Sequence, residues 1–149
     1  AQPDRMLIAR VGQADAELSA ALEGLRKLAT GIFPAILADE GLAAAVEALA
    51  EAAHGPMQIM TLPTQRFDAA VESAAYRVIS EIVRQAGTSP VKLAAFSGDG
   101  RLVLQLESPQ RPAELAELED RLGALDGWLE LGYATDGRAR IRAEIPCAS

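Results

Sequence analysis

A chain of 149 residues is long enough for one compact domain and one additional helix. Half of its residues are hydrophobic but only 4% are aromatic, so its core must be built from aliphatic side chains. A net charge of -7 gives the chain no electrostatic attraction for nucleic acids or anionic membranes, and we expect neither as a partner. No apolar run approaches the roughly 20 residues that span a bilayer. The single cysteine, Cys147, leaves no disulfide within the chain, which fits a reducing, cytoplasmic compartment.

The first predicted element is a long helix over residues 4–36. Its apolar residues recur in alternating three- and four-residue steps, a narrow stripe that favours packing on another helix in a dimer. The stripe consists of Val11, Leu18, Leu22, Leu25, Ala29, Ile32 and Ile36. An ordinary amphipathic helix lying on its own domain is the alternative. Pro34 lacks a backbone N–H, and we expect it to kink or end the helix near Ile32.

Helical and strand patterns alternate in the rest of the chain, and this order predicts a two-layer α/β sandwich with a mixed sheet. The predicted helices cover Leu42–Ala53, Phe67–Ala86 and a stretch from Pro112 to Gly127, and the predicted strands cover Met57–Leu62, Val91–Phe96, Arg101–Glu107, Trp128–Ala134 and Arg138–Ile145. Apolar and charged residues alternate along the last strand, so we expect helices to cover only one face of the sheet. The two glycines within residues 97–100 are expected to take positive φ in a hairpin turn.

Four blocks of the sequence, taken in order, resemble sensor histidine kinases of the nitrate-sensor and DesK-like type. They are residues 25–49, 74–81, 121–130 and 137–146. The resemblance implies the Bergerat, or GHKL, fold of ATPase domains, with residues 1–36 as a dimerisation-like helix and residues 37–149 as the ATPase-like domain. It further implies a homodimer formed through the N-terminal helix, and a response regulator or another signalling protein as partner.

The ATP-binding residues of that family are matched only in part. Glu81 matches the family's glutamate, and Gln85 occupies the position of the asparagine that ligates magnesium. Glutamine is one methylene longer, which would displace its carbonyl oxygen by roughly 1.5 Å. Glu107 is the candidate for the aspartate that accepts a hydrogen bond from adenine. The flexible glycines that follow that aspartate in the family are replaced by a segment containing Pro109 and Pro112.

The segment that would hold the phosphates is also changed. The predicted helix begins almost directly after Pro112, so the lid of the family is effectively deleted. Its first residues bring negative charge to the place of a triphosphate, from Glu114, Glu117, Glu119 and Asp120. The sole histidine, His54, falls at a helix end, where a capping role is expected rather than phosphotransfer or metal binding.

These observations favour a degenerate histidine-kinase-like module of two-component signalling with weak or no ATP binding. It would act in dimerisation, regulation or protein interaction and would need no cofactor. A divergent but active ATP-binding kinase domain is the first alternative, with Glu81 as a catalytic residue and with Gln85 and Glu107 binding Mg·ATP. The sequence therefore leaves open whether the chain is an enzyme. An anti-sigma-type binding module on the same fold is the second alternative.

A stripe of basic residues runs along the last predicted strand. It comprises Arg138, Arg140 and Arg142. We expect a solvated face, or one paired with Glu130 on the neighbouring strand. A docking patch for an acidic partner such as a receiver domain is the alternative.

Overall fold

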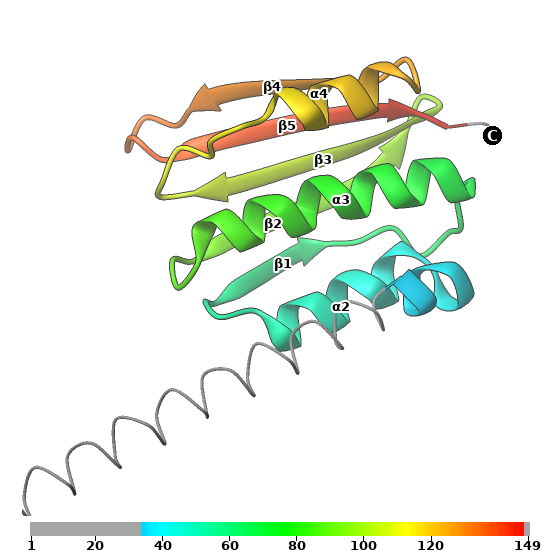
Figure 1. The fold of residues 1–149 in the computed structure, drawn as a ribbon, viewed down its shortest axis with the longest axis horizontal. Helices are drawn as coiled ribbons and strands as arrows, with labels where there is room; N and C mark the ends of the chain where they lie inside the picture. Colours follow the sequence, from blue (N-terminus) through cyan, green and yellow to red (C-terminus); the bar gives the residue numbers. More distant parts are fainter. Residues whose placement is uncertain (1–33, 148–149) are drawn as a thin grey trace, which may run out of the picture. The chain divides into compact units, whose positions relative to one another are not determined.

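The structure is a computed structural model that describes residues 34–147 (Figure 1). The predicted helix over residues 4–36 therefore lies almost entirely outside the described residues. The kink or end expected near Ile32 also lies outside the described residues. Residues 34–40 form a helical segment. It is broken at Gly41, whose φ of 100° lies in the region that favours glycine.

The remaining described residues form helices and strands in the predicted order. The elements are α2 (Leu42–Ala52), β1 (Met57–Thr61), α3 (Ala69–Ala86), β2 (Val91–Gly98), β3 (Arg101–Ser108), α4 (Ala116–Gly123), β4 (Trp128–Tyr133) and β5 (Ala139–Pro146). Gly87 has a φ of 60° and donates its N–H to the carbonyl of Arg84, and it thereby ends α3 at the expected residue.

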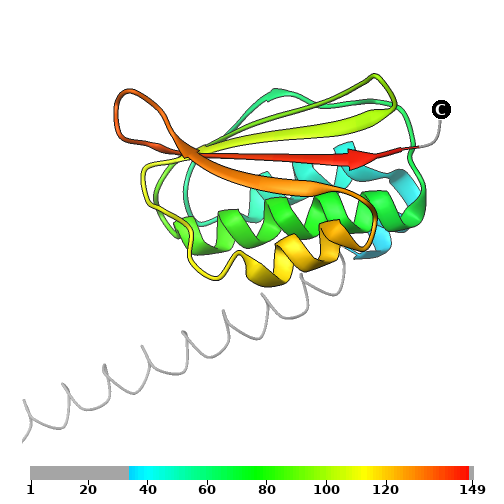
Figure 2. The same ribbon diagram turned by 90° about the horizontal axis from the view of Figure 1, so that it is seen from above.

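The five strands form one mixed sheet in the order β1-β2-β3-β5-β4. Strand β1 is parallel to β2, and every other neighbouring pair is antiparallel. The helices α2, α3 and α4 all lie on the same face of this sheet, with α3 packed between the other two (Figure 2). No element within residues 34–147 covers the opposite face. The prediction of a two-layer α/β sandwich is therefore confirmed.

Aliphatic side chains on the covered face of the sheet make the core, as the composition requires. On the central strand β3 these are Leu102, Leu104 and Leu106, and on β5 they are Ile141, Ala143 and Ile145. Helix α3 contributes the opposing layer through Val78, Ile79 and Ile82. Burial of these side chains holds α3 against the sheet, and this packing fixes the position of the candidate site residues Glu81 and Gln85 on α3.

Two local predictions differ from the structure. The hairpin between β2 and β3 takes positive φ at Asp99 and Gly100, with values of 54° and 71°, so Asp99 replaces Gly98 as the first turn residue. Helix α4 begins at Ala116 rather than directly after Pro112. The intervening residues 109–115 are not helical and include Glu114 with a φ of 55°.

Candidate functional site

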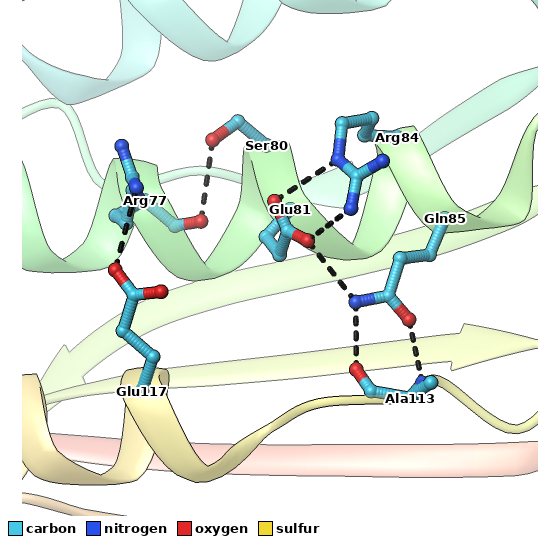
Figure 3. A network of polar contacts seen from close by, with 7 residues as sticks. All are labelled: Arg77, Ser80, Glu81, Arg84, Gln85, Ala113 and Glu117. Atoms are coloured by element: carbon cyan, nitrogen blue, oxygen red, sulfur yellow. Dashed lines mark hydrogen bonds and ion pairs between the residues drawn. The ribbon is translucent and has the colours of Figure 1, made fainter.

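Helix α3 brings Glu81 and Gln85 together near its C-terminal end, beside residues 109–115 (Figure 3). Residues four apart lie on the same side of a helix, so the two side chains are neighbours. The Nε2 group of Gln85 donates a hydrogen bond to Oε1 of Glu81 at 3.1 Å. The structure thus unites two of the three site residues that the sequence indicated.

The side-chain amide of Gln85 is also joined to the backbone of Ala113 by a reciprocal pair of hydrogen bonds (Figure 3). Its Nε2 group donates to the carbonyl oxygen of Ala113 at 2.8 Å, and its Oε1 atom accepts from the N–H of Ala113 at 2.6 Å. This pair of hydrogen bonds connects residues 109–115 to α3, in the same donor–acceptor pattern that joins two antiparallel strands. We call the Gln85–Ala113 pair the latch.

Arg84 holds the carboxylate of Glu81. Its Nε donates to Oε2 of Glu81 at 3.1 Å, and its Nη2 donates to Oε1. These hydrogen bonds are the main cause that lowers the pKa of Glu81 below its ordinary value, and the same contact raises the pKa of Arg84. A carboxylate with a lowered pKa is a weaker proton acceptor, so the pairing does not favour Glu81 as a general base.

Glu107 lies elsewhere. It follows the buried Leu106 on β3, so strand alternation turns its side chain to the uncovered face of the sheet. There it accepts hydrogen bonds from Nε and Nη2 of Arg140 at 3.1 and 2.8 Å, on the directly paired position of β5. The structure therefore does not bring Glu107 together with Glu81 and Gln85.

A pocket of about 280 Å³ lies where the end of α3 meets the segment after β3. Gln85, Ser108, Arg111 and Glu114 are among the residues that line it. Ser108 is only 3% exposed, and it shares the covered face with the leucines of β3 because it is an even number of positions away from them. The residue of β3 that reaches the pocket is thus Ser108, which the sequence analysis missed although the alternation of Leu102, Leu104 and Leu106 indicates it.

The basic stripe, formed by two residues of β5 and by Arg138 just before it, pairs with nearby acidic residues. Arg140 pairs with Glu107 at 2.8 Å, Arg142 with Glu144 at 3.0 Å, and Arg138 with Asp136 at 3.5 Å. Glu130 sits opposite Arg142 in the strand register but makes none of these contacts. The expectation of a solvated face agrees with the exposure of these arginines, whereas the expected pairing with Glu130 is wrong. Exposed pairs of this kind contribute roughly 0–1 kcal/mol each to stability.

Residues 34–147 give no support for a metal site or for a membrane-spanning helix. No group of three or more His, Cys, Asp or Glu side chains there could hold a metal ion. His54 lies in the loop between α2 and β1, just past the end of α2. Within the same part of the chain, no helix combines the length and apolar character needed to cross a membrane.

Comparison with known proteins gives matches among solved structures alone. No protein-family model and no curated protein sequence matches the chain. The blue-light activated histidine kinase EL346 of Erythrobacter litoralis superimposes with a TM-score of 0.56 and 15% identity, over 70% of this chain and 41% of that one. The histidine kinase AdeS of Acinetobacter baumannii gives a TM-score of 0.54 and 15% identity, over 89% and 79% of the two chains.

A third match is the histidine kinase domain of the E. coli osmosensor EnvZ, with a TM-score of 0.52 and 18% identity over 71% of this chain and 86% of that one. The present chain spans less than half the length of the EL346 chain. At these identities the likeness concerns the fold. The described residues therefore have the α/β fold of histidine-kinase ATPase domains.

Proposed function

We propose that this chain is a histidine-kinase-like module of two-component signalling that binds ATP weakly or not at all and acts as a regulatory or interaction domain. The latch carries the proposal. The amide oxygen of Gln85 that would have to ligate magnesium accepts the N–H of Ala113 instead. Turning the amide away would break both hydrogen bonds of the latch and a third to Glu81, which costs roughly 1.5–4.5 kcal/mol in total.

The charges around the latch support the same proposal. The guanidinium of Arg84 lies against Glu81 and is therefore already neutralised by a carboxylate. Glu114 lines the pocket, where a triphosphate would meet its negative charge. Glu107, the candidate adenine acceptor, is bound to Arg140 on the other face of the sheet. These side chains do not make a donor set that fits Mg·ATP.

The first expected result is that the melting temperature does not change when the full chain is titrated with ATP or ADP to millimolar concentration in the presence of Mg²⁺. A ligand that binds only the folded state stabilises it by about 2.7 kcal/mol at 100 times its Kd, so binding in the micromolar range would be visible in a thermal-shift titration. Titrations with Mg²⁺ alone and with nucleotide and EDTA serve as controls. A saturable, magnesium-dependent rise would contradict the proposal.

One observation favours the alternative of an active ATP-binding domain, namely that Glu81 and Gln85 lie side by side and that Gln85 lines the pocket. In that case the magnesium-dependent rise would occur in the native chain and would be abolished by Gln85→Ala. Ser80→Ala, on the same helix and outside the pocket lining, is the matched control and would leave the rise intact.

A second expected result concerns assembly, because we also propose that the chain forms a homodimer through the stripe on residues 4–36. Sedimentation equilibrium of the full chain at tens of micromolar, the range of a weak pair, is expected to give the mass of a dimer. Leu18→Glu and Leu22→Glu place charges in the stripe and are expected to give a monomer, whereas Glu23→Gln lies outside it and should not. A monomeric native chain would count against the stripe as an interface.

A further inference from the structure

The chain bends sharply at Gly41, between the helical segment 34–40 and α2. The N–H of Gly41 still bonds to the carbonyl oxygen of Leu37 at 3.1 Å, while Leu42 already begins the next helix. Two helix ends therefore meet at a single residue. The last carbonyl groups of the first helix and the first N–H groups of the second lack partners within their own helices and need others.

One ion pair supplies partners to both ends. Glu72, in the first turn of α3, has a side chain that is only 3% exposed, and its Oε2 accepts the backbone N–H of Leu42 at 3.3 Å. The guanidinium of Arg66 binds this carboxylate through Nε at 3.2 Å and Nη2 at 3.1 Å. A carboxylate at the start of α2 also suits the positive end of the helix dipole.

Arg66 completes the arrangement from its other side. Its Nη2 donates to the carbonyl oxygen of Ala38 at 3.0 Å, and its Nη1 donates to that of Asp39 at 3.2 Å. The guanidinium thus lies at the negative C-terminal end of the segment 34–40 while it binds Glu72 on α3. We call the Arg66–Glu72 pair, with its backbone partners on both sides of Gly41, the helix-end lock.

The glycine is part of the helix-end lock. A Cβ atom at position 41 would lie 2.7 Å from Cδ and 2.8 Å from Nε of Arg66, closer than carbon atoms approach in folded proteins. The positive φ of Gly41 adds a second reason against any other residue. Gly41 is therefore needed both for the bend of the chain and for the close packing of Arg66 against it.

We propose that the helix-end lock is a conformational joint that couples the bend at Gly41 to α3, and that opening it loosens the backbone at this bend while the sheet stays folded. The side chain of Arg66 is half-exposed, so the ion pair itself lies at the surface, while Leu37 and Leu42 on either side of the bend belong to the hydrophobic core. Gln85, the α3 member of the latch, lies about 20 Å beyond Glu72 along the same helix by the helical rise.

The test is amide hydrogen exchange by NMR on the full chain and its variants Arg66→Met and Glu72→Gln. The readout is the N–H of Gly41, which bonds to Leu37 and not to either member of the ion pair. Its exchange is expected to rise about tenfold to 100-fold, the scale of a lost charged hydrogen bond. The amides of Leu104 and Ile141 in the sheet are expected to exchange as in the native chain.

Two further variants make the test specific. Gly41→Ala disrupts the helix-end lock through a steric clash with Arg66 and leaves the charges of the ion pair in place. The N–H of Leu42 is expected to exchange faster by the same factor. Arg121→Met breaks an exposed ion pair with Glu117 on α4 and should leave both amides unchanged. The proposal is overturned if Arg66→Met and Glu72→Gln leave Gly41 protected, or if the sheet amides lose protection equally. This result does not depend on whether the chain binds nucleotide.

Discussion

Leu104→Ala is expected to lower the free energy of unfolding by about 2–5 kcal/mol, measured by urea denaturation of the full chain. Leu104 is fully buried on β3, which has β2 on one side and β5 on the other. Removing three carbon atoms there leaves a cavity on the face covered by the helices, and a sheet pinned on both sides cannot collapse to fill it. The melting temperature is expected to fall accordingly.

Gln105→Ala is the matched control, because Gln105 is the next residue of the same strand and points to the uncovered face. Its side chain is partly exposed, so we expect a change of less than about 1 kcal/mol. A similar loss in both variants would contradict the assignment of faces. It would mean that the uncovered face of the sheet is packed as tightly as the covered one.

The fold could be predicted because the local patterns agree with the tertiary structure. The alternation along β5 specified both the strand and the single covered face, and the apolar positions of α3 specified its buried side. The start of α4 was mispredicted because proline is favoured in the first turn of a helix. In the structure the latch holds the backbone of Ala113 beside α3, and α4 begins only at Ala116.

The candidate site was less predictable, because it depends on contacts between distant parts of the chain. Helical spacing was enough to place Glu81 beside Gln85. No local pattern indicated that Gln85 would bind Ala113, 28 positions away in sequence. Glu107 was the candidate for the adenine contact, but strand alternation turns it to the uncovered face and places Ser108 at the pocket. The Arg66–Glu72 pair was missed because two charged residues in sequence do not reveal which helix ends they will meet.

Gln85→Ala is expected to increase the exchange rate of the Ala113 amide about 10-fold to 100-fold. The variant removes both hydrogen bonds of the latch, each worth roughly 0.5–1.5 kcal/mol, and residues 109–115 should open without unfolding of the sheet. Ser80→Ala removes an exposed side-chain contact from the same helix and is expected to leave the exchange of Ala113 unchanged. Protection of Ala113 in Gln85→Ala would show that other contacts hold the segment.

Gln85→Asn extends this test to the length of the side chain. Asparagine is one methylene shorter, so its amide should not reach Ala113, and the exchange rate should rise as in Gln85→Ala. The native chain with Mg·ATP gives the decisive comparison. If magnesium drew the amide oxygen of Gln85 away from Ala113, nucleotide would accelerate exchange at this amide. Unchanged exchange at millimolar Mg·ATP is the expected result, because a chain that does not bind the nucleotide keeps the latch closed.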